Sequence, residues 1–332
     1  MFKQISLKNY RTHKLTTLEL GSVNVLIGAN NAGKSNLLSG IRHFSRLAAR
    51  GRPPQDFSEM DRGGREYSRR LRSGDLFNHR HRLAAPEQPL ELLCVWQHKL
   101  GEIEYQIELL EEHTLSEHVG CRERIEIRRK EGTKRFQTGT PEASPELLLR
   151  SQLETEDLDH VERQLVHCFF RDIASCYRYD FQPSFLSGKV HTEGRQLDRD
   201  NVRIASQLGD EGGNLQAILR HVQEDDERTF NRILASLRRF DDSFHGIGYD
   251  EKRGRVNWLF DLGRIPARLD EFPPDMVSDG LLRAAAIALL SSMRYPPAFI
   301  LVEEIENGIN QKNLSGFIEW LRQSAGTCDS AE

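Results

Sequence analysis

Residues Val23 to Ser35 read VNVLIGANNAGKS, and this stretch decides the fold that the sequence predicts. Its first five residues are a short β-branched run typical of a central parallel strand. From Asn36 to Leu47, apolar residues recur at helical spacing. Gly51-Arg52-Pro53-Pro54 is predicted to end that helix, because proline lacks a backbone donor. The order strand, glycine-bearing loop, helix predicts an α/β fold.

The loop between this strand and this helix predicts phosphate binding. Residues 28–35 match the pattern G-x-x-x-x-G-K-[ST], and they stand between the two elements that the pattern requires. Glycines let backbone amides approach a phosphate, and the helix N-terminus adds a favourable dipole. We expect Lys34 to reach the β- and γ-phosphate oxygens and the Ser35 hydroxyl to bind magnesium. ATP and Mg²⁺ are therefore the predicted ligands.

Two consecutive acids follow a second apolar strand, which is predicted over Ala298–Val302 as a buried central strand. P-loop ATPases hold magnesium with an acid at the end of a strand beside the P-loop strand. Glu303 fits that position and is the predicted metal ligand. Its neighbour Glu304 is predicted to orient and deprotonate the attacking water, which makes it the candidate catalytic residue.

A third motif, Ser278-Asp279-Gly280, stands directly before an apolar helix predicted over Leu281–Met293. Taken alone, it predicts a helix N-cap. Its place ahead of the strand that ends in two acids resembles the signature loop of ABC ATPases. In that loop, the serine and backbone amides bind the γ-phosphate held by the opposite subunit.

Together these motifs resemble ABC-type P-loop ATPases of the RecF/SMC/OLD-like family, found in bacterial anti-phage defence (Septu-like or related systems) and in DNA maintenance. The opening strand with residues 5–11, residues 212–219 and residues 302–309 carry the resemblance further. The family commonly has Asp at position 303, Pro at 305 and His-Pro at 310–311, where this chain has Glu303, Ile305, Asn310 and Gln311. The resemblance implies ATP binding by Arg11, Gly28, Ala29, Asn30, Asn31, Ala32, Gly33, Lys34, Ser35 and Asn36, with Ser278, Asp279 and Gly280 acting in trans.

The rest of the chain is predicted to belong to one ABC-type ATPase domain over residues 1–332. Alternating patterns predict an opening strand pair at 2–7 and 17–20 and a later pair at 246–249 and 256–260. Helical composition covers 141–176 and 214–240. The predicted portions are a P-loop portion (1–54), an arginine-rich loop (55–88), an antiparallel β portion (90–130, with strands at 90–96, 103–110 and 124–129), a helical insertion (141–240) and a signature and Walker B portion (246–332).

The family continues after Walker B into a further strand that carries a switch histidine. Here a helix predicted over Lys312–Ser324 is followed by only a few polar residues. The C-terminal end of the fold is therefore expected to be missing. Weak ATPase activity is expected until a partner or further sequence supplies it. In ABC proteins, a glutamine links magnesium to the inserted lobe. Its position in this chain is not assigned, and the candidates are Gln55, Gln88 and Gln97.

Composition excludes several classes of protein. The net charge of −4 is not the basic excess of a nucleic-acid coat, although arginines cluster between Arg62 and Arg82. Neither a membrane span nor a secretory leader is predicted, and we expect a cytoplasmic protein. Five scattered cysteines predict neither a disulfide framework nor a zinc site: Cys94, Cys121, Cys168, Cys176 and Cys328.

The predicted function is that of an ATPase whose copies form a head-to-tail homodimer around ATP. The resemblance implies that nucleotide-driven closure regulates a separate effector, a nuclease in anti-phage defence, because the chain shows no nuclease signature of its own. One alternative is a RecF-like DNA-repair ATPase that binds DNA through the Arg62–Arg82 region. Another is a nucleotide sensor or scaffold that does not hydrolyse ATP.

Overall fold

The computed structural model describes residues 1–49, 80–85, 88–111, 119–138, 149–154, 156–188, 208–250, 255–263, 268–292 and 297–305, with 318 and 322. The chain divides into two compact units. Unit 1 comprises Met1–Cys176 and Pro297–Phe299, and unit 2 comprises Tyr177–Pro296 and Ile300–Glu332.

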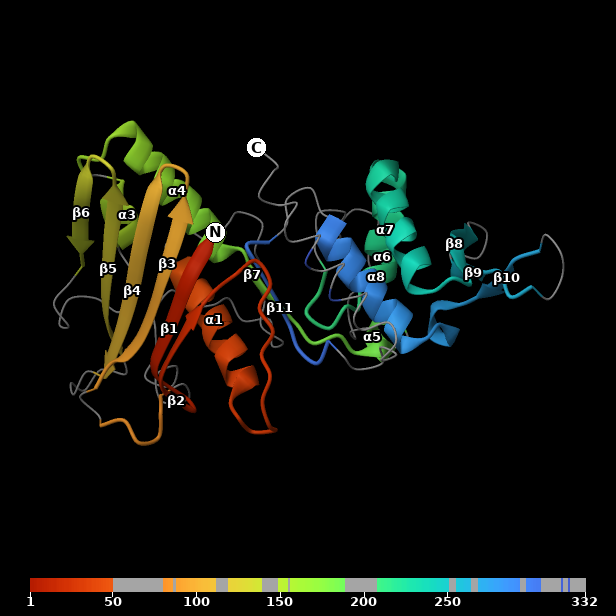
Figure 1. Ribbon diagram of the computed structural model, residues 1–332, viewed down its shortest axis with the longest axis horizontal. Coiled ribbons are helices and arrows are strands. Elements are labelled where there is room, and N and C mark those ends of the chain that lie inside the picture. Colours follow the sequence, from red (N-terminus) through yellow and green to blue (C-terminus); the bar gives the residue numbers. More distant parts are fainter. Residues whose placement is uncertain are drawn as a thin grey trace. The chain divides into compact units, whose positions relative to one another are not determined.

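Unit 1 is built on a six-stranded antiparallel sheet in the order β2-β1-β3-β4-β5-β6 (Figure 1). The opening strand pair and the three later strands expected from the sequence are confirmed, and the structure joins them in one sheet. The strand β6 is an addition that the sequence pattern did not predict. The strands are β1 (Phe2–Tyr10), β2 (His13–Glu19), β3 (Leu90–His98), β4 (Gly101–Glu111), β5 (Val119–Arg129) and β6 (Gly132–Gln137).

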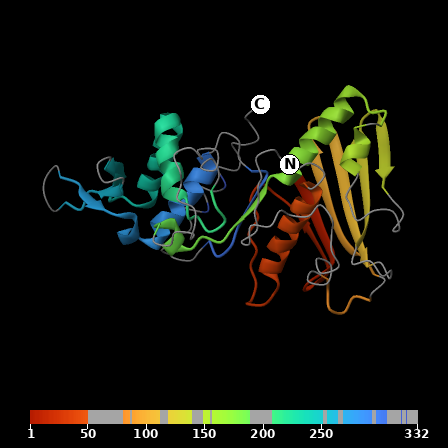
Figure 2. The same cartoon turned by 180° about the vertical axis from the view of Figure 1, so that it is seen from behind.

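One face of this sheet forms the core of unit 1. Cross-strand partners such as Leu7 with Leu92, and Cys94 with Tyr105, alternate along their strands with more exposed residues. The period of two places all four side chains on the buried face. Helices α1 (Lys34–Ala49) and α4 (His160–Ala174) cover this face (Figure 2), and a short helix, α3, spans Leu149–Leu153.

The opposite face of the sheet carries a network of ion pairs. Arg128 of β5 contacts Glu102 and Glu104 of β4 at 2.7 Å each, and it contacts Glu126 of its own strand at 2.8 Å. Arg135 of β6 also pairs with Glu126, at 2.7 Å. Opposite charges that face each other across neighbouring strands stabilise the pairing.

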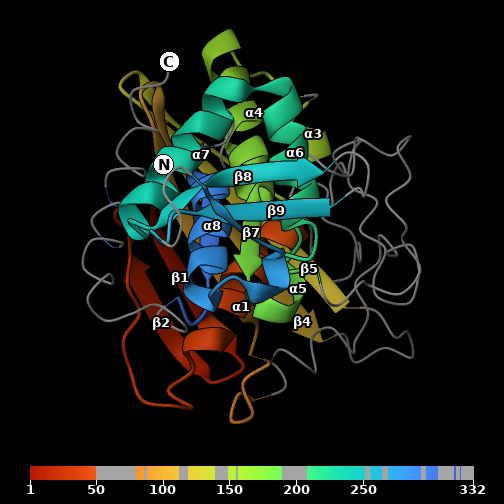
Figure 3. The same cartoon turned by 90° about the vertical axis from the view of Figure 1, so that its right-hand side faces the viewer.

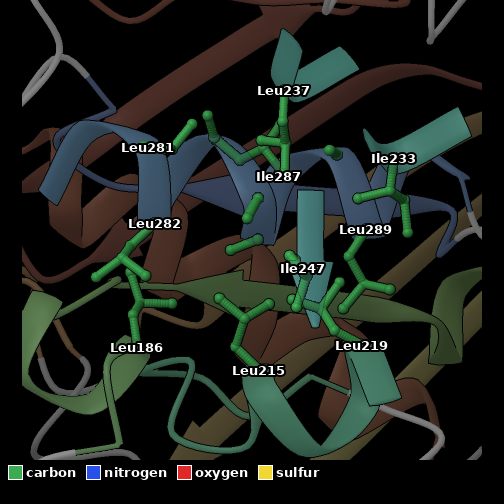
Figure 4. Packing of buried hydrophobic residues seen from close by; sticks show 14 of the residues in the cluster. Leu186, Leu215, Leu219, Ile233, Leu237, Ile247, Leu281, Leu282, Ile287 and Leu289 are labelled. Atoms are coloured by element: carbon green, nitrogen blue, oxygen red, sulfur yellow. The ribbon is translucent and has the colours of Figure 1, made fainter. Parts of the chain in front are cut away.

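Unit 2 is built around α8, the apolar helix predicted from the sequence. All residues of this helix from Gly280 to Leu290 are buried. Figure 4 shows Leu281, Leu282, Ile287 and Leu289 of α8 among apolar side chains of α5, α6, α7 and β8. The helices are α5 (Pro183–Leu186), α6 (Leu215–Asp225), α7 (Glu227–Phe240) and α8 (Asp279–Ser292), with a 3₁₀ turn, η2, at Pro274–Met276.

A small antiparallel sheet in the order β10-β9-β8 completes unit 2. Figure 3 shows β8 and β9 side by side, as the sequence predicted for this pair. The short strand β10 was not predicted. The strands are β8 (Phe244–Asp250), β9 (Arg255–Phe260) and β10 (Asp270–Phe272).

The helical tract expected over residues 214–240 is two helices. Asp226 separates α6 from α7, and its carboxylate accepts a hydrogen bond from the Thr229 backbone amide at 3.0 Å. This is an N-cap, because the side chain satisfies an amide that the first turn leaves unpaired.

The strand predicted over Ala298–Val302 is present as β11 (Phe299–Val302), and it pairs with β7 (Cys176–Tyr179). The Phe299 amide donates to the Ser175 carbonyl at 3.1 Å, and the Glu303 amide donates to the Tyr179 carbonyl at 3.0 Å. Both strands run in the same direction along these bonds, so the pair is parallel.

The expectation of a central strand at Val23–Ile27 is wrong for this structure. These residues lie outside any strand, and the side chains of Val25 and Ile27 are 62% and 92% exposed. A β-branched run becomes a strand only where a neighbour supplies hydrogen bonds and burial. The interpretation of β11 as a buried central strand is also wrong, because among the described residues it pairs only with β7, and Ile300 is 37% exposed.

Candidate functional site

The glycine-bearing loop curls around the ammonium group of Lys34, at the start of α1. Lys34 Nζ donates to the carbonyl of Gly28 at 2.6 Å and to that of Ala29 at 3.0 Å. Left-handed backbone at Asn31 (φ 66°) and Gly33 (φ 95°) produces the curl. The loop therefore brings the cation and the N-terminal end of α1 to one place, which is the arrangement that binds phosphate groups.

The turn between β1 and β2 holds the far end of this loop. An added Cβ at Gly33 would lie 2.7 Å from Thr12 Oγ1, so only glycine fits there. His13 Nε2 lies 3.1 Å from the Gly33 carbonyl oxygen. Arg11 Nη1 donates to Asn36 Oδ1 at 3.3 Å, which places two predicted nucleotide-binding residues in contact.

Ser35 and Glu303 carry the oxygen ligands proposed for magnesium. Ser35 is the second residue of α1 and is exposed, and Glu303 follows β11 directly. Magnesium prefers hard oxygen ligands and uses few protein groups together with phosphate oxygens, so the hydroxyl and the carboxylate are each a suitable ligand chemically. Among the described residues, no group of three or more His, Cys, Asp or Glu side chains could hold a metal by itself.

Arg178 of β7 holds the Glu303 carboxylate. Both Nε and Nη2 of the arginine contact the same oxygen, Oε1, of Glu303. The two side chains are only 28% and 14% exposed, so this charge pair is partly shielded from water. Glu303 therefore already has a positively charged partner within unit 2.

Arg283 of α8 fixes the backbone beside Glu303. Its Nη1 donates to the Glu304 carbonyl oxygen at 3.1 Å, and its side chain is buried. Within the described residues, Arg283 Nε has no hydrogen-bond partner. Glu304 has a left-handed backbone conformation (φ 48°), which is costly for a residue with a Cβ. The Arg283 contact thus ties the strained residue to the buried helix.

The predicted signature loop forms the N-terminus of this same helix. The Leu281 amide donates to Ser278 Oγ at 3.3 Å, which confirms the predicted cap. Asp279 and Gly280 are the first two residues of α8. Arg283 lies one turn further along, so a single helix carries the Ser278–Gly280 loop and the contact to Glu304.

Sequence reasoning missed Thr12, His13, Arg178 and Arg283. The first two follow Arg11 directly, and their place after the opening strand was the available signal. Arg283 stands three residues after the Ser278–Gly280 loop, and nothing in the apolar pattern of its helix indicated a contact with Glu304. Arg178 had no signal, because it meets Glu303 only through the pairing of β7 with β11.

Several predicted features lie outside the described residues. They include residues 62–79 of the arginine cluster, Gln55, Asn310, Gln311, Cys328 and most of the helix predicted over Lys312–Ser324. The other four cysteines are free thiols. In the part of the chain that the structure describes, no helix is both long and apolar enough to cross a membrane.

Comparisons with known proteins match two families. Residues 1–83 match the family described as "AAA ATPase domain". Residues 180–328 match the family described as "AAA domain, putative AbiEii toxin, Type IV TA system". None of the curated proteins compared with the chain matches it. The first match includes the loop around Lys34, and the second includes the Ser278–Gly280 loop and both acids, so together they support an AAA/ABC-type P-loop ATPase family for this chain.

Proposed function

We propose that this protein binds Mg²⁺-ATP and hydrolyses it in a head-to-tail homodimer. The loop that curls around Lys34 at the N-terminus of α1 carries the proposal, because this arrangement suits a triphosphate. In the proposed site, Lys34 binds the β- and γ-phosphates, and Ser35 and Glu303 hold the metal. Bound magnesium would neutralise charge on the phosphates.

Glu304 is the proposed general base. Its carboxylate would accept a proton from the attacking water as the bond to the γ-phosphate breaks and ADP leaves. The opposite copy would contribute Ser278 and Gly280, whose backbone amides at the start of α8 suit an anion. The account therefore needs two copies for each active site.

Closure of the dimer on ATP would regulate a separate effector, which we propose to be a nuclease in bacterial anti-phage defence. The family resemblance supports this setting. The description of the second matched family, which names a toxin and a type IV toxin–antitoxin system, is in keeping with it.

Hydrolysis assays test the division of labour between the two acids. Glu304→Gln should retain ATP and lose turnover, because the amide is nearly isosteric but cannot accept the proton. Glu303→Gln should instead change the magnesium concentration that ATP hydrolysis requires. An ATP-trapped state from Glu303→Gln and not from Glu304→Gln would contradict the assignment. ATP binding with no turnover at all in the wild type, rather than the weak activity expected of the chain alone, would favour the sensor or scaffold.

Mixing two inactive variants tests the shared site. Lys34→Ala removes the cation proposed to bind the phosphates. Ser278→Arg blocks the Ser278–Gly280 loop that the opposite copy would contribute. A mixed dimer would contain one site with Lys34 and Ser278 both intact, so the mixture should recover turnover that neither variant shows alone. A mixture as inactive as its components would contradict the head-to-tail arrangement.

A further inference from the structure

The side chain of Arg178 contacts Glu303, the acid proposed to bind magnesium. Its guanidinium therefore lies where the metal ion would bind. Its Nε and Nη2 both contact Oε1 of Glu303. The pairing of the two parallel strands includes a hydrogen bond from the Glu303 amide to the Tyr179 carbonyl at 3.0 Å. Because Arg178 directly precedes Tyr179, this bond fixes Glu303 beside Arg178. The contact thus rests on the pairing of β7 with β11, and not on two mobile surface side chains.

The charge of Arg178 bears directly on any metal that Glu303 binds. Charge-assisted bonds from two nitrogens withdraw electron density from the oxygen and hold the carboxylate in one orientation. The guanidinium also repels a divalent ion brought to the same group, and partial burial strengthens that repulsion. Movement of the Arg178 side chain away from Glu303 relieves this repulsion.

We propose that Arg178 is a positioning residue that holds Glu303 in the metal-free protein and competes with magnesium for its carboxylate. This inference rests on the proposed function. When the proposed site binds magnesium together with the nucleotide, Glu303 would turn its carboxylate oxygen from the guanidinium to the metal. The competition raises the magnesium concentration that nucleotide binding requires. Nucleotide without magnesium therefore does not close the site.

Thermal unfolding of the full chain with a non-hydrolysable ATP analogue tests the proposal. The magnesium concentration at half of the maximal melting-temperature shift is the quantity compared, and it does not depend on turnover. Arg178→Gln removes the charge and should lower that midpoint on the order of tenfold. Arg178→Lys keeps the charge with a weaker, single-point contact and should give an intermediate value.

Arg220→Gln is the matched control. Arg220 also belongs to unit 2 and pairs with a glutamate, Glu224, at 2.8 Å on the exposed surface of α6. The magnesium midpoint of Arg220→Gln should equal that of the wild type. A purely structural effect of losing an arginine–glutamate pair would instead change the midpoint of both variants.

A midpoint in Arg178→Gln equal to or above the wild-type value overturns the proposal. If Arg178→Gln does not fold, Arg178→Lys decides by the same criterion. If the wild type itself shows no magnesium-dependent shift, and Lys34→Ala behaves identically, the proposed function falls and takes this inference with it. A normal wild-type response with an unchanged Arg178→Gln midpoint overturns the inference alone.

Discussion

Glu304 combines the proposed catalytic carboxylate with a strained backbone. Its φ of 48° costs about 1 kcal/mol for a residue with a Cβ. Glu304→Gly should therefore be more stable than Glu304→Ala, by about 1 kcal/mol, although neither variant should hydrolyse ATP. Urea unfolding of the two variants measures the difference.

Glu227 provides the control for this comparison. It is the first residue of α7, so glycine there should be less stable than alanine, by up to about 1 kcal/mol. If glycine were less stable than alanine at residue 304, as expected at Glu227, the left-handed conformation of Glu304 would be refuted.

At the residue scale, the functional groups that could be predicted from the sequence are those that belong to a motif of consecutive residues. The match at 28–35 needs only consecutive residues, and the structure shows Lys34 inside the curled loop. Arg178 and Glu303 are far apart in the chain, and their contact depends on a strand pairing that one sequence does not specify. The same holds for Arg283, whose buried guanidinium would be unexpected on an apolar helix without the Glu304 carbonyl to bind.

Among the elements, α1 depends on close approach to the sheet. A Cβ added at Gly40 would lie 2.5 Å from Leu7 Cδ1 and 3.1 Å from a ring carbon of Tyr10, and both of those residues are fully buried. Gly40→Ala should therefore destabilise unit 1 by about 1–3 kcal/mol, because neither neighbour has room to move. Thermal unfolding measures the loss.

Gly246→Ala is the control for this substitution, because an added Cβ there meets nothing within 4 Å. Its effect on stability should be clearly smaller than that of Gly40→Ala. Equal stability of Gly40→Ala and wild type would show that α1 does not lie against β1 as closely as described.

The charged face of the large sheet gives a pH prediction. Hydrogen bonds from Arg135 and Arg128 lower the pKa of Glu126 to about 2. The unfolded chain has a higher carboxyl pKa, so the stabilising contribution is fully present above about pH 4.5 and is lost as the pH falls towards 2. The stability difference between wild type and Glu126→Gln should shrink over that range. A difference independent of pH would contradict the paired geometry.

Elements were predictable where periodicity was strong and where partners lay nearby in the chain. The antiparallel strands β3, β4 and β5 and the buried helix α8 are of this kind. Val23–Ile27 has the composition of a strand, but strand formation depends on neighbours, and its apolar side chains remain exposed. The division of residues 214–240 at Asp226 carried a capping signal, an acid before a polar turn, which the apolar periodicity obscured.

At the scale of the whole molecule, the proposed chemistry draws on both units. The loop around Lys34 belongs to unit 1, and Glu303, Glu304 and the Ser278–Gly280 loop belong to unit 2. The two family matches likewise cover the two ends of the chain. Motifs within one chain predicted this combination. The proposed effector and the proposed shared active site are properties of an assembly, so the sequence of one chain does not specify them.

Equilibrium titration of Mg²⁺-ATP tests the central claim most directly. It should be carried out in the Glu304→Gln background, which prevents turnover during the measurement. Adding Lys34→Ala should weaken ATP binding on the order of a hundredfold, because the substitution removes the cation that the loop holds at the proposed phosphate site. Equal ATP affinity with and without Lys34 would contradict the account.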